Sequence, residues 1–196
     1  MTRDFFNEQA EHWDKMVAEK DASKLEQMVG RLRIKRGDRI LDVGAGTGVL
    51  LPYLLKKVGG GGEVIALDHA EKMLSKAKAK DFKERIDFLC ADVMTLPIES
   101  GIIDAVICYS SLPHFPDKAK AMIEIKRVLK KDGWVFVCHT VGSEHINQIH
   151  RQIHLVQNDL LPDAIEMTTL LSKAVFTEIQ VEDKADSYFA SARKTG

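Results

Sequence analysis

Short apolar runs alternate with amphipathic stretches along most of the chain. Polar or glycine-rich segments bound the runs, which predicts strands, and the apolar residues between them recur at helical spacing. Continuous apolar runs are typical of parallel strands that are buried on both faces. The pattern therefore predicts an α/β fold whose mostly parallel sheet has helices on both faces. Strands are predicted at 39–43, 64–67, 86–90, 102–108 and 134–138, and helices at 47–57, from residue 71 onward and at 117–130.

Both ends of the chain add elements to this repeating pattern. Two helices are predicted before the first strand, at 4–19 and 22–34, and the first has an apolar face that includes Phe6 and Trp13. Such a helix either packs on the edge of the core or covers a ligand site. After the fifth strand, helices are predicted at 143–158 and 163–174, and strands at 176–181 and 188–191. The connection between the last two strands is short, so they are expected to pair antiparallel.

A glycine-rich turn joins the first strand to the helix that follows. Gly44, Gly46 and Gly48 stand at alternate positions, where glycine lets the chain turn sharply and lets a ligand lie against bare backbone. The following helix directs its N-terminal N–H groups and positive dipole end toward such a ligand. We therefore expect a nucleotide-like cofactor. The dinucleotide fingerprint G-x-G-x-x-G has its third glycine where this chain has Val49.

Two blocks of the sequence resemble the class I S-adenosylmethionine (SAM) methyltransferases. Leu41-Asp42-Val43-Gly44-Ala45-Gly46-Thr47-Gly48 is similar to the first motif of that family, and Arg127-Val128-Leu129-Lys130-Lys131-Asp132-Gly133-Trp134 is similar to its RVLKPGG block. The resemblance is strong over 37–140 and weak elsewhere. It implies a Rossmann-like seven-stranded sheet that ends in an antiparallel hairpin. We expect one domain over 1–196, with an N-terminal helical cap at 1–36 and the core at 37–196.

Three predicted strands have an aspartate at or next to their carboxyl end. Asp42, Asp68 and Asp92 are expected at one edge of the sheet, where open α/β sheets bind ligands. Asp68 ends the second strand, and an acidic residue there accepts hydrogen bonds from ribose hydroxyls, in NAD as in SAM. The resemblance implies that Met73 lies against the adenine ring and that Asp92 binds its amino group. The expected cofactor-binding residues are Trp13, Asp42, Gly44, Ala45, Gly46, Gly48, Asp68, His69, Met73, Ala91, Asp92, Val93 and Tyr109.

Histidines are the candidates for a base, which methyl transfer needs only where the acceptor must lose a proton. His114 and His139 follow the fourth and fifth predicted strands, so both are the candidate catalytic residues. Solvated or capping roles remain an alternative for the whole group, which also includes His145. His150 and His154 share a helix face, and a metal site that joins them to His139 is a further alternative.

Composition limits the partners and the compartment. The net charge of −1 gives no basic field to attract nucleic acid, and no apolar run approaches the ~20 residues that span a bilayer. The N-terminus lacks the apolar stretch of a signal peptide. Three cysteines in strand-like runs suggest reduced thiols and a cytoplasmic protein. The charged stretch 143–158 is expected either to contact the acceptor or to form a homodimer interface.

The leading hypothesis is a SAM-dependent methyltransferase that transfers a methyl group to a small-molecule acceptor by in-line displacement. Tyr109-Ser110-Ser111-Leu112 departs from the Asn/Asp-Pro-Pro-aromatic signature of enzymes that methylate nucleobase amines. One alternative is an NAD-dependent reductase, although its Tyr-x-x-x-Lys pair, Tyr53 and Lys57, lies on the helix after the glycine turn. The other alternative is a non-catalytic SAM-binding subunit, which would share the cofactor site.

Overall fold

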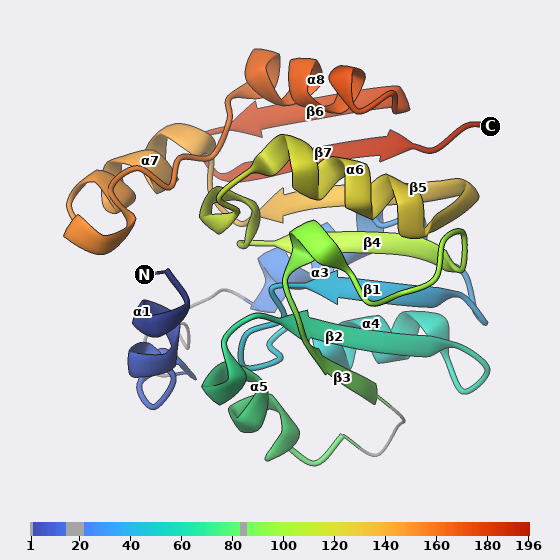
Figure 1. The fold of residues 1–196 in the computed structure, drawn as a ribbon, viewed down its shortest axis with the longest axis horizontal. Coiled ribbons are helices and arrows are strands. Elements are labelled where there is room, and N and C mark those ends of the chain that lie inside the picture. Colours follow the sequence, from blue (N-terminus) through green and yellow to red (C-terminus); the bar gives the residue numbers. More distant parts are fainter. Residues whose placement is uncertain (1, 15–21, 83–85) are drawn as a thin grey trace.

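A seven-stranded sheet forms the centre of the structure (Figure 1). The computed structural model describes residues 2–14, 22–82 and 86–196. The strands lie in the order β3-β2-β1-β4-β5-β7-β6. Their bounds are β1 Arg39–Val43, β2 Glu63–Asp68, β3 Ile86–Cys90, β4 Ile103–Tyr109, β5 Leu129–His139, β6 Thr177–Lys184 and β7 Ser187–Arg193.

The direction of the strands follows from the length of the segments that join them. β3, β2, β1, β4 and β5 are parallel, because each is connected to the next through a crossover long enough to include a helix or helical turn. β6 and β7 are joined by residues 185–186 and pair antiparallel, and β7 also pairs antiparallel with β5. This arrangement confirms the predicted mostly parallel sheet with an antiparallel C-terminal hairpin. The strand order reverses between β1 and β4, and ligands of open α/β sheets bind at such a point.

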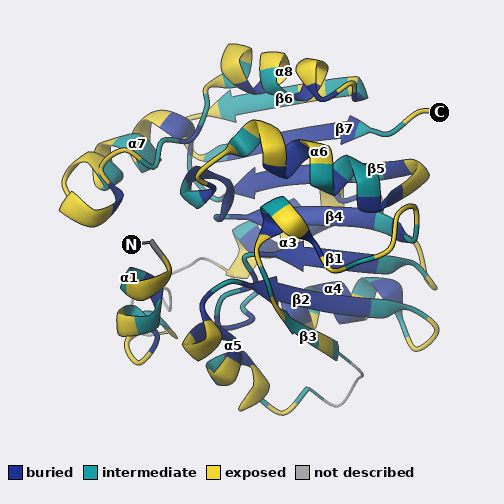
Figure 2. Ribbon diagram, viewed as in Figure 1, coloured by how far each residue is buried: buried dark blue, intermediate teal, exposed yellow. Residues whose placement is uncertain are grey.

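Helices cover both faces of the sheet, and their apolar sides form two core clusters (Figure 2). α3 (Ala22–Arg31) and α4 (Leu51–Val58) share one cluster with the central strands. α6 (Lys118–Val128) and α8 (Ala164–Lys173) contribute to the other. α5 (Glu71–Lys78) packs against β2 and β3. The buried sheet therefore holds the carboxyl ends of its parallel strands in fixed positions.

Two further helices lie beyond those strand ends. α1 (Thr2–Gln9) and α7 (Ser143–Arg151) are both at the edge toward which the parallel strands point (Figure 1). α1 contacts α5, and it also contacts the 3₁₀ turn η3 (His154–Val156) that follows α7. The N-terminal helix and the turn that follows α7 thus meet beyond the carboxyl ends of the parallel strands (Figure 1).

The predicted helix over 4–19 is wrong in its extent. α1 ends at Gln9, and residues 10–12 form a turn in which the His12 N–H donates to the Gln9 carbonyl at 3.0 Å. The turn lets Trp13 pack edge-on against Phe6, with 5.4 Å between the ring centroids. Residues 15–19 of the predicted helix lie outside the described residues.

Two other predicted helices have different bounds in the structure. The helix expected at 47–57 begins at Leu51, because positive φ angles at Gly46 and Gly48 keep the preceding residues in a turn. The helix expected at 143–158 ends at Arg151 and is followed by η3. Within the described ranges, no helix is long and apolar enough to cross a membrane.

Candidate functional site

The glycine turn is held against the next strand by its own backbone. The N–H groups of Gly44 and Ala45 both donate to the Leu67 carbonyl, at 2.8 and 2.9 Å. Gly44 has a φ of 74°, and a Cβ at this position would lie 2.3 Å from the Cβ of Ser111. The Ser111 hydroxyl in turn donates to the Val43 carbonyl at 2.6 Å. Glycine is thus required here for two reasons: its backbone has a positive φ, and Ser111, in the loop after β4, lies too close to leave room for a side chain.

Gly48 has a structural role rather than a place in the cavity wall. Its φ is 82°, and a Cβ would lie 2.8 Å from Cδ1 of Leu51 and 3.3 Å from Cβ of Ala77. The residue therefore allows the start of α4 to pack closely against α5. Of the predicted cofactor-binding glycines, Gly44 and Gly46 line the cavity described next.

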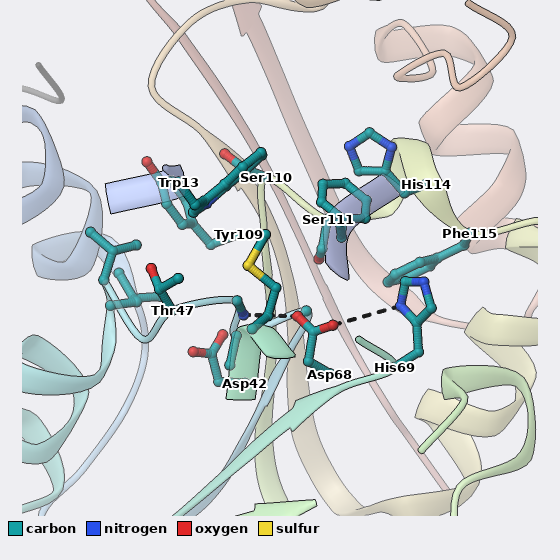
Figure 3. Close-up of a pocket in the computed structure, with 17 residues that line it drawn as sticks. Trp13, Asp42, Thr47, Asp68, His69, Tyr109, Ser110, Ser111, His114 and Phe115 are labelled. Carbon is teal, nitrogen blue, oxygen red and sulfur yellow. Dashed lines mark hydrogen bonds and ion pairs between the residues drawn. The ribbon is translucent and has the colours of Figure 1, made fainter. Parts of the chain in front are cut away.

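An open cavity lies between the glycine turn, the carboxyl ends of the strands and the segment that contains α1 (Figure 3). Its wall combines aromatic and apolar side chains with two buried carboxyl groups, Asp42 and Asp68. A cavity of this composition suits a small organic ligand. Its lining residues are Phe6, Trp13, Asp42, Gly44, Ala45, Gly46, Thr47, Val49, Leu50, Asp68, His69, Met73, Tyr109, Ser110, Ser111, His114 and Phe115.

The structure brings most of the predicted cofactor-binding residues to this cavity or to the one beside it. The second cavity is lined by Ala91, Asp92 and Val93 and shares Gly44, His69, His114 and Phe115 with the first. The Asp92 carboxylate accepts a hydrogen bond from the Met94 N–H at 2.8 Å, which starts a 3₁₀ turn and leaves the side chain exposed. The two cavities together follow the carboxyl ends of β1, β2 and β3.

Asp68 connects the glycine turn to α5. One carboxylate oxygen accepts from the Gly46 N–H and the other from the Ala70 N–H, each at 2.8 Å. Burial raises the pKa of Asp68, and these two hydrogen bonds oppose the rise. A carboxylate has about four acceptor sites, so each oxygen of Asp68 retains capacity for a further donor. His69 lies beside it, with its Nδ1 at 3.7 Å from Oδ1 of Asp68 (Figure 3).

Asp42 is the other buried carboxyl group of the cavity wall. It is 2% exposed, and among the described residues its Oδ2 has no hydrogen-bond partner. Burial and, to a smaller extent, the neighbouring charge of Asp68 raise the pKa of Asp42 to about 7. A buried carboxyl group without a partner is costly to ionise. A cationic group of a ligand would remove that cost.

His114 and His139, the two candidate catalytic residues, lie at different cavities. His114 lines the two cavities described above, whereas His139 lines a third one with Arg31, Tyr188 and Phe189. His139 is buried, and its ring stands edge-on to Tyr188 at 6.0 Å between centroids. The structure therefore does not bring the two histidines to one site.

His114 pairs with a residue that sequence analysis did not identify. Its Nδ1 lies 2.9 Å from Oδ2 of Asp159, and its ring is 4.8 Å from the ring of Phe6. His150 is also close, with 5.0 Å between the two imidazole centroids. Among the residues that the structure describes, no three His, Cys, Asp or Glu side chains are grouped so that they could hold a metal ion. The alternative metal site at His139, His150 and His154 is thus not supported by the geometry.

The N-terminal segment is attached to the site by polar contacts that sequence patterns did not predict. The Thr47 hydroxyl, 2% exposed, donates to Oδ1 of Asp14 at 2.5 Å. The segment also forms exposed ion pairs with α5 and with Lys80, which follows that helix. The pairs are Arg3–Glu71 at 2.9 Å, Glu11–Lys76 at 2.6 Å and Asp14–Lys80 at 2.9 Å.

Comparisons with known proteins agree with this geometry. A family model described as a methyltransferase domain matches residues 41–137. Demethylmenaquinone methyltransferases of Lactobacillus johnsonii and Lactococcus lactis are 38% and 36% identical over 114 and 145 residues, which are 56% and 70% of this chain. Those matches cover 47% and 58% of the two relatives, so the chain spans about half the length of the curated proteins that it matches.

Solved structures share the fold over nearly the whole chain. A SAM-dependent methyltransferase from Thermotoga maritima superposes with a TM-score of 0.79 at 18% identity and covers 100% of both chains. One from Aquifex aeolicus gives a TM-score of 0.72 at 23% identity and covers 95% of this chain and 96% of its own. Residues 41–137 therefore belong to the methyltransferase-domain family, and the chain has the fold of these SAM-dependent methyltransferases.

Proposed function

We propose that this protein uses SAM to methylate a small-molecule acceptor. The observation that carries the proposal is the pair of buried carboxyl groups below the glycine turn, Asp42 and Asp68. SAM carries an ammonium group and a ribose, and these are the donors that such carboxyl groups can accept. When bound, SAM supplies a methyl group that is already activated by a sulfonium centre.

The described residues fit the separate parts of such a cofactor. The unpartnered oxygen of Asp42 would accept from the ammonium group, and the remaining acceptor sites of Asp68 would accept from the ribose hydroxyls. Met73, which is 1% exposed and lines the cavity, offers an apolar contact for adenine. Asp92 in the adjoining cavity would accept from the adenine amino group.

The remaining wall of the cavity supports a small acceptor. Phe6, Trp13 and Phe115 contribute aromatic rings to the lining of the cavity. Aromatic walls of this kind position a ligand and exclude water, which are the main contributions that a protein makes to an in-line displacement. The demethylmenaquinone methyltransferases among the relatives are consistent with an aromatic acceptor.

The reductase alternative receives little support from the structure. Lys57 donates to the Leu32 carbonyl at 2.7 Å, so its ammonium group is used to attach α3 to α4. Tyr53 packs against the core cluster that contains α3 and α4. Neither residue lines the cavity at the glycine turn.

We propose in addition that the chain acts as a single domain over 1–196, in which the segment that contains α1 caps the site and α3 packs with the core at 37–196. Its location in the cytoplasm, the absence of nucleic acid among its partners and a homodimer through residues 143–158 remain predictions from sequence. The ion pairs between the N-terminal segment and α5 support the cap.

Turnover tests the proposal directly. The protein is incubated with SAM and a panel of hydroxyl, amine and thiol acceptors, and S-adenosylhomocysteine is quantified by chromatography. We expect acceptor-dependent formation of S-adenosylhomocysteine. Cofactor binding without turnover on any acceptor would favour the non-catalytic subunit instead.

A further inference from the structure

Asp159 reaches the site from a segment that lies far from it in the sequence. It follows η3, and its carboxylate is 2.9 Å from Nδ1 of His114, which follows β4. Both side chains are largely covered, with 23% of Asp159 and 13% of His114 exposed. Two partly buried groups at this distance form a charge-assisted hydrogen bond, which is stronger than one in open solvent.

The backbone around Asp159 is fixed by side chains of α7. Asn147 donates from its amide to the Leu161 carbonyl at 3.0 Å and accepts from the Leu161 N–H at 2.8 Å. His150 forms a hydrogen bond through Nδ1 to the Asp159 carbonyl. The Asp159 N–H donates to the Val156 carbonyl at 2.9 Å. Asp159 is therefore held on both sides, which orients its carboxylate toward His114.

The pairing determines where the neutral His114 ring carries its proton. A carboxylate only accepts, so Nδ1 must donate, and Nε2 is then deprotonated. Among the described residues Nε2 has no hydrogen-bond partner, and the ring lines the two cavities. Burial lowers the pKa of His114; the Asp159 carboxylate opposes this, while His150 and Lys118 add to it. The ring is thus neutral near pH 7 and has a basic nitrogen available.

We propose that Asp159 is a positioning residue that holds His114 with Nε2 deprotonated, as the base that removes a proton from a hydroxyl group of the methyl acceptor. This inference rests on the proposed function and adds a chemical class of acceptor to it. Neutral amines already present a lone pair, whereas a hydroxyl oxygen gains much of its nucleophilicity by losing its proton.

The step balances without any further reactant. The O–H bond of the acceptor breaks, and its proton moves to Nε2 of His114, which becomes an imidazolium beside the Asp159 carboxylate. An oxygen electron pair forms the bond to the methyl carbon, and the electrons of the carbon–sulfur bond remain on sulfur. His114 then returns the proton to water. Lys118 supports the geometry, because its ammonium group donates to the Pro113 carbonyl at 3.0 Å next to His114.

The test is nuclear magnetic resonance of protein labelled with ¹⁵N-histidine, recorded without cofactor or acceptor. We expect the neutral His114 ring to show a protonated Nδ1 and an unprotonated Nε2. Asp159→Leu should return the ring to the Nε2-protonated form that predominates in free histidine. Asp159→Asn should keep the tautomer, because its amide oxygen still accepts, but shift the titration of His114 to lower pH since the charge is gone.

Asp132→Asn is the matched control. Asp132 lies at the opposite end of the sheet, and its φ of 67° suits asparagine.

A proton on Nε2 in the native protein, or a tautomer unchanged in Asp159→Leu, would overturn the proposal. In the turnover assay His114→Gln should lower kcat on hydroxyl acceptors at least ~100-fold, and turnover confined to amines or thiols would also overturn it. Failure to bind SAM would refute the proposed function while leaving the tautomer result intact.

Discussion

At the scale of residues, Gly44 is a position where a Cβ atom would clash with Ser111. A Cβ would meet the Cβ of Ser111 at 2.3 Å, whereas at Gly101, which has a similar φ of 72°, it would meet nothing within 4 Å. Both Gly→Ala variants impose a left-handed residue, which costs about 1–2 kcal/mol. We expect Gly44→Ala to lose clearly more stability in urea denaturation than Gly101→Ala. Equal losses would contradict the close approach of Ser111.

Asp42 should make stability depend on pH. Its pKa of about 7 in the folded protein exceeds the ordinary value of 3.8, so the folded state binds the proton more tightly than the unfolded state does. The stability contributed by the protonated group is complete below about pH 4 and is lost as the pH rises to about 7. Asp42→Asn should therefore become progressively more stable than native protein as the pH rises from about 4 to about 7, and the difference at pH 8 should be on the order of 4 kcal/mol.

Thermal or urea unfolding from pH 4 to pH 8 measures this gain. Glu99→Gln serves as the control, because it removes one exposed carboxylate. A gain from Asp42→Asn that does not change with pH would show that Asp42 is ionised throughout the range.

At the scale of elements, α1 contacts α5 through exposed charges in addition to the apolar cluster that contains Phe6 and Met73. Glu71 accepts from Arg3 at 2.9 Å and from Asn7 at 3.1 Å. Exposed ion pairs contribute little individually and are screened by salt. We expect Glu71→Gln, or 0.5 M salt, to accelerate hydrogen exchange of α1 amides roughly two- to fivefold. Glu99→Gln should have no effect, and unchanged exchange in Glu71→Gln would mean that apolar contacts alone hold α1.

The elements themselves were largely predictable from sequence. Apolar runs fixed the five parallel strands, and the short link before Ser187 indicated the antiparallel hairpin. The error at residues 4–19 arose because the apolar spacing continues through a turn at 10–12, and that turn is specified by packing between Phe6 and Trp13. Periodicity reports which face is buried, but it does not report where a helix is interrupted.

At the scale of the whole molecule, the cavity is lined by residues that range along the chain from Phe6 to Phe115. Asp159 contacts one of them, His114. Asp42 and Asp68, which sequence analysis placed at strand ends, both line the cavity, because parallel strands align their carboxyl ends. It missed Asp14 and Asp159, because both reach the site only through tertiary contacts, which the spacing of apolar residues does not report. His139 is the last residue of β5, and β5 pairs with β7 on the side away from β4. His139 therefore lies at another cavity, together with Tyr188 and Phe189 of β7.

The central claim is that the glycine turn and Asp68 hold SAM, and calorimetry with S-adenosylhomocysteine tests it most directly. NAD is the control ligand, and Asp68→Asn is the variant, with its melting temperature monitored because Asp68 also binds Gly46 and Ala70. We predict binding in about the micromolar range to native protein, weakened on the order of 100-fold in the variant through lost charge-assisted hydrogen bonds, and no binding of NAD. Native protein that prefers NAD, or that fails to bind S-adenosylhomocysteine, would contradict the account.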